Sequence, residues 1–311
     1  MKDTIFCVLN VLVSVVLIIL SLRYVTDYWL LAFVYSLQTH IAIVCIAVIL
    51  FSLLLKRHWY TGLLLVVGLF LAIHPFFMLR EFATAPERAH TDQRVFRLMS
   101  FNILNSNFSN GEKIADAIIA SNADVAFILE APPIASQVQR ISQVYPYRVG
   151  CGEGMPKCGI VVFSKRPILD STIRSLSDLW SNRLVRVAID LDGQPVNFIA
   201  VQLAKPYFDE FHTFELYNLS RVLRDIKGPL VLAGDFNSAM IAPDMQRFLR
   251  TNDLKNMFPE PTTWPILAGR YGISIDHVFA RAPLQLKSVN RIEDNMGSNH
   301  FGLMSEFVIR Q

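Results

Sequence analysis

Leu230-Val231-Leu232-Ala233-Gly234-Asp235-Phe236-Asn237 is the segment that decides the fold. Its apolar residues follow Gly228-Pro229 and predict a short strand buried on both faces. Asp235 and Asn237 lie two positions apart at the end of this rigid element, so both can hold fixed positions around a reacting group. A carboxylate is a hard ligand or a base, and an amide donates hydrogen bonds to an oxyanion. A strand followed by an Asx-type turn is the alternative.

The composition divides the chain into two unlike parts. With 311 residues and 52% hydrophobic content, the chain is too apolar for one ordinary soluble domain, and the excess lies in the first 80 residues. Residues 1–80 carry five basic and two acidic side chains, whereas residues 81–311 carry 24 of each. The second part therefore lacks the broad basic field of a nucleic-acid-binding protein, and no strong basic surface of that kind is predicted.

Three apolar runs in residues 1–80 are long enough to cross a bilayer: Ile5–Leu22, one within Tyr28–Leu55 and one within Tyr60–Leu79. Buried core helices are the alternative. No cleavage pattern follows the first run, so we interpret it as a retained span rather than a signal peptide. The cluster Lys56-Arg57-His58 places the loop between the second and third spans in the cytoplasm. The amino terminus is then cytoplasmic, and everything after Arg80 lies outside.

A polar segment, residues 81–94, predicts a linker between this membrane domain (residues 1–80) and a second domain (residues 95–311). The second domain is β-rich with interspersed helices. Strands are predicted at 95–104, 124–130, 159–164, 168–173, 184–191, 195–203, 273–280 and 304–309, in addition to the opening segment. Helices are predicted at 112–120, 211–226 and 243–250, with a short one ending near 143.

The cysteines fit an oxidising compartment. Cys151 and Cys158 flank a short Gly-rich loop and are predicted to close a hairpin disulfide, which persists only where thiols are oxidised. Two unbonded cysteines that pack as small hydrophobic side chains are the alternative. A zinc site is disfavoured because no His/Cys pair lies nearby in the sequence.

Several predicted strands end in residues that carry chemistry, and a further polar element precedes the last strand. An acid at the end of a buried strand is more often a cap or turn residue than a ligand, so each signal is weak alone. The groups are Asn102; Glu130; Asp235 with Asn237; Asp276-His277; and Ser298-Asn299-His300.

In this order and spacing, the groups resemble the endonuclease/exonuclease/phosphatase superfamily, the DNase I-like and sphingomyelinase-like metal-dependent phosphoesterases. The resemblance covers about Val95 to Ile309. Gly-Asp-Phe-Asn, Ile-Asp-His and a closing Ser-x-His form a fairly specific combination. The resemblance implies an α+β fold, a four-layer α/β/β/α sandwich, here preceded by three transmembrane helices. Bacterial members with a few amino-terminal spans look most similar, which implies the bacterial inner membrane and a periplasmic second domain.

The same resemblance assigns the roles. Glu130 would be the main ligand of Mg²⁺, or of Mn²⁺ as the alternative, with Asn102 close by and Asn299 as a further metal-site residue. Asp276 would orient His300 as a positioned imidazole, and Asp235 would orient or deprotonate the attacking water. Asn237 would hydrogen-bond the developing oxyanion, whereas His277 would support the site rather than react.

Two positions depart from the family pattern. Gln202 stands where the family commonly has a histidine; it can donate to a phosphate oxygen as a substrate-binding residue but cannot carry a positive charge. Asn299 replaces the aspartate of the usual Ser-Asp-His, which makes the site less negative. These departures motivate a rival hypothesis, a catalytically impaired binding module on the same fold.

The leading hypothesis is a membrane-anchored, Mg²⁺-dependent phosphoester hydrolase whose catalytic domain faces the outside of the cytoplasmic membrane. The tether favours a lipid-linked phosphate as substrate, and the family at large favours nucleic acid. A transport or sensing device is a third hypothesis, but the spans lack paired intramembrane charges.

Overall fold

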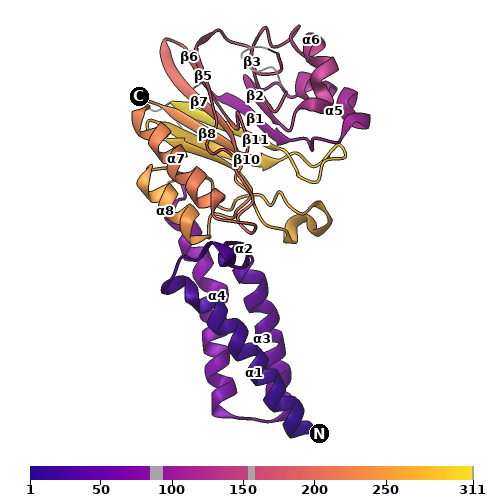
Figure 1. The fold of residues 1–311 in the computed structure, drawn as a ribbon, viewed down its shortest axis with the longest axis vertical. Coiled ribbons are helices and arrows are strands. Elements are labelled where there is room, and N and C mark those ends of the chain that lie inside the picture. Colours follow the sequence, from indigo (N-terminus) through magenta and orange to yellow (C-terminus); the bar gives the residue numbers. More distant parts are fainter. Residues whose placement is uncertain (85–93, 153–157, 310–311) are drawn as a thin grey trace.

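The computed structural model describes residues 1–84, 94–152 and 158–309. Most of the predicted linker and the loop between Cys151 and Cys158 lie outside these residues. Helices α1 (Lys2–Ser21), α2 (Ala32–Ser36), α3 (Gln38–Leu55) and α4 (Trp59–Glu81) come first, with 3-10 turns at Leu22–Tyr24 and Trp29–Leu31. Figure 1 shows α1, α3 and α4 as a stalk with the amino terminus at its far end and the α/β domain at the other.

The three long helices are apolar enough to cross a membrane. The second lies within the predicted range Tyr28–Leu55 and begins at Gln38, because the short helix α2 occupies the first part of that range. Polar side chains join the helices in the interior of the bundle. Asn10 Nδ2 donates to Ser52 Oγ at 2.7 Å, and Thr61 Oγ1 donates to Asn10 Oδ1 at 2.9 Å. Such interhelical hydrogen bonds fix the helices relative to one another where apolar surface cannot.

Two mixed sheets form the second domain. The first has the order β10-β11-β1-β2-β4-β3 and the second β5-β6-β7-β8-β9. The strands of the first are β1 (Phe96–Asn102), β2 (Val125–Leu129), β3 (Tyr147–Val149), β4 (Ile160–Ser164), β10 (Leu284–Arg291) and β11 (Leu303–Ile309). Those of the second are β5 (Ile168–Arg174), β6 (Leu184–Leu191), β7 (Gln194–Gln202), β8 (Leu230–Asp235) and β9 (Asp276–Arg281).

Helices cover the outer face of each sheet (Figure 1). One apolar cluster, which includes Phe127, Phe198 and Phe307, fills the space between the sheets. A second packs one sheet against α7 (Phe211–Asp225) and α8 (Pro243–Thr251). A third packs the other sheet against α5 (Gly111–Ala120), the 3-10 turn Pro132–Gln137 and α6 (Val138–Ile141). These layers confirm the predicted four-layer sandwich.

Strand β8 is buried on both faces, as its sequence predicts. Val231 and Ala233 face the inter-sheet cluster, and Leu230 and Leu232 face the helices. At Gly234, φ is +145°, and a Cβ atom there would lie 1.9 Å from the carbonyl oxygen of Val201. Glycine is therefore required where β8 passes this close to its neighbour.

Strands β3 and β10 were not predicted from the sequence. β3 has three residues and too little pattern to recognise. β10 contains a register shift between Leu286 and Ser288 in its pairing with β11, which breaks the period-2 alternation. The remaining predicted strands are all present, although β9 begins at Asp276 rather than at Ile273.

The helical stalk is packed tightly against the domain. Phe82, just after α4, is buried in the cluster beneath α7 and α8. Ser36 Oγ of α2 accepts a hydrogen bond from the backbone N–H of Ala239 at 3.2 Å, and Arg23 donates to the carbonyl oxygen of Ile241. The segment that follows Asn237 therefore rests on the domain end of the stalk.

Candidate active site

Strand pairing brings the predicted site residues to one edge of the two sheets. In the first sheet β1 and β2 are parallel, and Asn102 lies opposite Leu129, the residue before Glu130. In the second sheet β7 and β8 are parallel, with Gln202 opposite Asp235. β9 is antiparallel to β8 and starts at this same edge, where Asp276 lies opposite Asp235. Residues far apart in sequence thus meet because their strands end or begin together.

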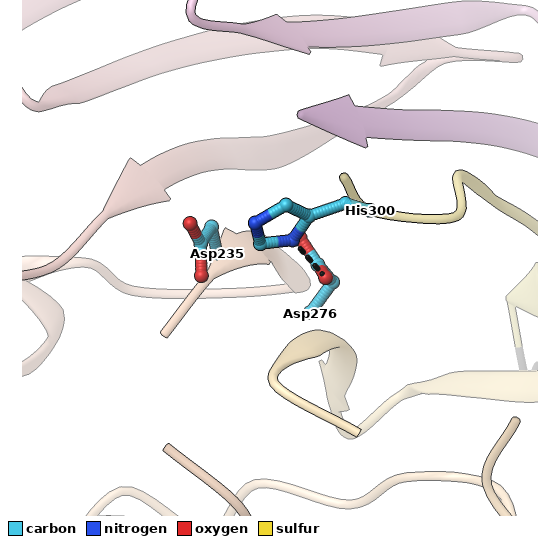
Figure 2. Close-up of side chains that lie close together, drawn as sticks. All are labelled: Asp235, Asp276 and His300. Carbon is cyan, nitrogen blue, oxygen red and sulfur yellow. Dashed lines mark hydrogen bonds and ion pairs between the residues drawn. The ribbon is translucent and has the colours of Figure 1, made fainter. Parts of the chain in front are cut away.

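The innermost group consists of Asp235, Asp276 and His300, all of them buried. One ligand atom from each lies within 4.8 Å of the others. His300 Nδ1 is 2.8 Å from Asp276 Oδ2, and the other ring nitrogen of His300 faces Asp235 (Figure 2). The backbone N–H of His300 donates to Ser298 Oγ, which itself donates to the carbonyl oxygen of Asn102. These bonds hold the histidine between two carboxylates.

Glu130 joins this group through amide side chains. Asn102 Nδ2 donates to Glu130 Oε1 at 3.1 Å and to Asp235 Oδ2 at 3.0 Å. Gln202 Nε2 donates to Glu130 Oε1 at 2.7 Å, and the backbone N–H of Asn105 donates to Glu130 Oε2 at 2.8 Å. The carboxylate of Glu130 is therefore fixed in one orientation.

Glu130 and Asn237 both adopt left-handed backbone conformations, with φ values of 53° and 51°. Side chains other than glycine adopt this region at an energetic cost, and such residues gather at functional sites. The amide of Asn237 donates to the carbonyl oxygen of Leu203 at 2.9 Å and to Asp235 Oδ2 at 3.3 Å. Asn237 and Asn102 thus both donate hydrogen bonds to the carboxylate of Asp235.

The pKa values of Asp235 and His300 are both raised above their usual range. Burial, together with the charge of Asp276, raises the pKa of Asp235 to about 6, although His300 opposes the shift. Burial would lower the pKa of His300, but the charges of Asp276 and Asp235 outweigh it and raise the pKa to about 9. At neutral pH the histidine is therefore an imidazolium and Asp235 is largely ionised.

Burial would likewise raise the pKa of Glu130, but hydrogen bonds from Asn105, Asn102 and Gln202 outweigh burial and lower it. This carboxylate is therefore kept ionised and ready to bind a cation.

A cavity of about 350 Å³ opens beside the group. Polar site residues form one wall, and apolar and cationic side chains form the rest. The lining comprises Glu130, Leu179, Trp180, Arg183, Gln202, Leu203, Ala204, Lys205, Phe208, Asp209 and Asn237. An anionic group placed here would lie next to Glu130 and Asn237 and face two cations.

The family model for endonuclease/exonuclease/phosphatase proteins matches residues 99–300, which include all the residues of this group. The chain belongs to the endonuclease/exonuclease/phosphatase family. The predicted membership is confirmed, and with it the coarse expectation that members of this family are generally divalent-metal-dependent phosphoester hydrolases. No curated protein matches the chain in sequence.

Solved structures of endonuclease/exonuclease/phosphatase proteins share the fold. A family protein from Beutenbergia cavernae superposes with a TM-score of 0.56 at 18% identity, over 70% of this chain and 72% of its own. Beta toxin from Staphylococcus aureus gives 0.52 at 15% identity, over 68% and 99%. D. rerio TDP2 in complex with a single-strand DNA product gives 0.56 at 14% identity, over 68% and 98%.

The donor set fits the divalent metal ion that members of the endonuclease/exonuclease/phosphatase family generally use. Glu130, Asp235 and Asp276 offer hard carboxylate oxygens, which Mg²⁺ and Mn²⁺ prefer. Gln202 Oε1 is buried and has no hydrogen-bond partner among the described residues, although its amide nitrogen is bound to Glu130. A buried acceptor beside a carboxylate suits a cation or a donor from a bound ligand.

Not every predicted site residue joins the group. Asn299 is exposed and takes part in none of the hydrogen bonds described above, so its metal-site role stays a prediction. His277 is buried and bonded at both nitrogens, to Glu260 Oε1 at 2.6 Å and to the carbonyl oxygen of Ser238 at 2.8 Å. It supports the fold beneath the site.

Other residues at the site gave no recognisable sequence signal. Thr263 Oγ1 accepts hydrogen bonds from the backbone N–H groups of Ile275 and Asp276 and so fixes the start of β9. Arg183 precedes β6, beside Gln202, and carries a charge near Glu130 and Asp235. A single arginine before a strand is common and does not by itself predict a site residue. Arg183 lies at the site because β6 pairs with β7, which places it beside Gln202.

Cys151 and Cys158 form a disulfide at the edge of the first sheet. It lies in the connection between β3 and β4, and neither cysteine lines the cavity.

Proposed function

We propose that this chain is a membrane-anchored, divalent-metal-dependent phosphoester hydrolase whose catalytic domain lies outside the cytoplasm. The observation that carries the proposal is the convergence of Asp235, Asp276 and His300 with Glu130 and Asn102 beside one cavity. This set combines a base, a cationic donor and a ligand carboxylate within one hydrogen-bonded group.

In this proposal Asp235 accepts the proton of the attacking water. Its pKa of about 6 lies close to neutral pH, where a base is both ionised and able to accept a proton. His300, protonated and held by Asp276, donates from Nε2 to a phosphoryl oxygen as negative charge builds up there. Asn237 lines the cavity and stabilises the same developing charge.

Glu130, with Asn102 and the free amide oxygen of Gln202, would hold the metal ion, Mg²⁺ or Mn²⁺. When bound, the ion would polarise a phosphoryl oxygen and offset the charge of the transition state. The hydrogen bonds to Glu130 keep this ligand carboxylate ionised and oriented.

The topology is part of the proposal. The basic residues Lys56 and Arg57 lie in the loop between α3 and α4, at the end of the stalk far from the domain. Cationic loops stay in the cytoplasm, so the domain lies on the other side of the membrane. The disulfide between Cys151 and Cys158 supports an oxidising compartment for the domain.

The test uses the full-length protein in detergent with bis-p-nitrophenyl phosphate as a generic diester. We expect hydrolysis that depends on Mg²⁺ or Mn²⁺, is abolished by EDTA and falls by about 10³-fold in Asp235→Asn. Glu112→Gln, which changes an exposed acid of α5, serves as the matched control and keeps the wild-type rate. Equal rates in wild type and Asp235→Asn would end the proposal.

A non-catalytic binding module is the second candidate, since Gln202 occupies one oxygen of Glu130 with a neutral amide. Metal-dependent binding of the diester without turnover in the same assay would favour it.

A further inference from the structure

The cavity beside Glu130 combines cations with apolar surface. The guanidinium of Arg183 lies 5.3 Å from the ring centroid of Trp180, and the charges of Glu130, Asp235 and Glu215 act on it. Lys205 lies on the same cavity wall. Trp180 and Phe208 are 53% and 70% exposed, so both present apolar surface to a ligand in the cavity. The cavity therefore suits a ligand with both an anionic and an apolar part.

A row of aromatic rings leads from this cavity to the stalk. Phe208 lines the cavity and packs against Tyr207 in a tilted arrangement, with ring centroids 4.6 Å apart. Tyr207 in turn contacts Phe33 of α2, at 5.2 Å. Phe33 also meets Trp264, at 6.3 Å, next to the threonine that fixes the start of β9. The segment after β7 and the segment before β9 thus both contact one residue of the stalk, Phe33.

Phe33 lies where the stalk leaves the membrane in the proposed topology. Helix α2 connects the span that ends at Tyr24 to the span that begins at Gln38. Tyr28 and Trp29 precede it, and aromatic residues of this kind gather at the level of the lipid headgroups.

A second loop of the domain reaches the same level. The carbonyl oxygen of Tyr271 is 2.8 Å from Nε2 of His40, which lies in the first turn of α3. The loop Ile266–Tyr271 carries Leu267, 98% exposed, and the Tyr271 side chain, 71% exposed. Figure 1 places the domain directly above α2 and the upper end of α3. Exposed apolar side chains beside a membrane helix are covered when they enter the bilayer surface.

We infer that the substrate is a lipid phosphoester that enters from the outer leaflet along Phe33, Tyr207 and Phe208, with its phosphate held by Arg183 and its apolar chain left in the bilayer. The inference rests on the proposed function and specifies its substrate.

The charge distribution favours a lipid over a nucleic acid. Residues 81–311 carry equal numbers of basic and acidic side chains, and among the described residues that line the cavity the basic ones are Arg183 and Lys205. Two cations suit a single phosphate group, whereas a polynucleotide needs a cationic track along several phosphates.

The test compares membrane-embedded and soluble substrates of matched chemistry. The full-length protein is reconstituted into vesicles that contain phosphatidylglycerol, a diester, or phosphatidic acid, a monoester. The soluble partners are bis-p-nitrophenyl phosphate and p-nitrophenyl phosphate, and a single-stranded oligonucleotide is added as a competitor class. The measured quantity is the ratio of kcat/KM on the lipid to kcat/KM on its soluble partner.

We expect a ratio above one for wild type and a ratio about tenfold lower for the double variant Tyr207→Ser/Phe208→Ser. Tyr217→Ser is the matched control, because Tyr217 is an exposed aromatic residue of α7 away from the cavity, and its ratio should equal that of wild type. Unchanged melting temperatures of the variants in detergent show that they fold.

Three results would overturn the inference. Soluble esters hydrolysed at a normal rate with no lipid hydrolysis would end it and leave the proposed function intact. The same conclusion holds for an unchanged ratio in the double variant, or for faster cleavage of the oligonucleotide than of the lipid. Hydrolysis of none of these esters would instead contradict the proposed function, and the inference with it.

Discussion

Two buried histidines of this domain, His212 and His300, both pair with an aspartate but differ in the hydrogen bonding of the second ring nitrogen. His212, on α7, has Nδ1 at 2.8 Å from Asp244 and Nε2 at 2.8 Å from the carbonyl oxygen of Phe236. His300 has Nδ1 at the same distance from Asp276, yet its Nε2 forms no hydrogen bond with any described residue and faces the carboxylate of Asp235 (Figure 2). The second ring nitrogen is what separates a structural histidine from one available for chemistry.

His277 strengthens the comparison, because it too is bonded at both nitrogens, to Glu260 and to the backbone of Ser238. The family resemblance assigned the reactive role to His300 and a supporting role to His277, and the second hydrogen bond of His277 agrees with that supporting role. A histidine–carboxylate pair is therefore weak evidence of catalysis until the partner of the other nitrogen is known.

The largest expected effect concerns activity. His300→Gln removes the cationic donor that faces Asp235 and should lower kcat on a soluble phosphodiester by about 10³-fold. His212→Gln should leave kcat per folded molecule within about twofold. Steady-state kinetics on folded protein, quantified by circular dichroism, measures both, and a similar loss of kcat in the two variants would erase the distinction.

The next effect concerns stability, for which the larger loss is expected in His212→Gln and not in His300→Gln. His212→Gln leaves Asp244 buried without its cationic partner, which should lower the free energy of unfolding by about 3 kcal/mol. Denaturant unfolding of the full chain in detergent measures the loss. A smaller loss for His212→Gln than for His300→Gln would contradict our assignment of the two roles.

The stabilisation by this pair has a definite pH window. Burial disfavours the charged form of both groups, but each charge favours the ionised form of its partner. The pKa of His212 is therefore raised and that of Asp244 is lowered. The histidine contribution is complete below its unfolded pKa of about 6.5 and is lost as pH rises through the folded pKa. The aspartate contribution is complete above about 3.9 and is lost as pH falls through its folded pKa. The stability difference between wild type and His212→Gln should therefore be largest between about pH 4 and 6.5.

At the active site the corresponding groups should control the pH profile of the rate. Below about pH 6 Asp235 is protonated and kcat/KM should fall about tenfold per pH unit, and above about pH 9 the loss of the His300 proton should lower it again. His300→Gln should lose the alkaline limb of the profile and keep the acid one. An alkaline limb that survives in this variant would show that another group titrates there.

A smaller effect is expected at the cavity wall. Arg183→Gln removes the half-buried cation beside Glu130 and should raise KM about tenfold with a lesser change in kcat, because the contact serves substrate binding in the ground state and the transition state alike. Arg186→Gln is the matched control, because Arg186 lies in β6, three residues after Arg183, and is paired with Asp170 away from the cavity. Equal KM values in the two variants would remove Arg183 from the binding site.

Much of the candidate site was predictable from the sequence because its polar residues lie at the ends of buried strands. Asn102, Glu130, Gln202 and Asp235 follow recognisable apolar segments, and their convergence follows from the pairing of parallel strands. The four-layer fold came from the family resemblance, because apolar periodicity shows that a strand is buried without showing which sheet it joins.

The rest depended on tertiary contacts that leave no mark in a single sequence. Gln202 was expected to donate to a phosphate, yet its amide nitrogen is already bound to Glu130. Arg183 and Thr263 reach the site only through the pairing of β6 and the loop before β9. The contact of Phe33 with the domain depends on how the stalk docks, which hydropathy does not specify.

The left-handed conformation of Glu130 separates two ways of removing the same carboxylate. Glu130→Ala keeps a Cβ atom at φ 53°, whereas Glu130→Gly adopts that geometry freely, so the glycine variant should be more stable by about 1 kcal/mol although both lose the ligand. Among inactive variants at this position, heat resistance would rank them by backbone freedom and not by side-chain size. The molecule thus gives up some thermal resistance at the residue that we propose as the metal ligand, and an unfolding experiment detects this without any knowledge of the substrate.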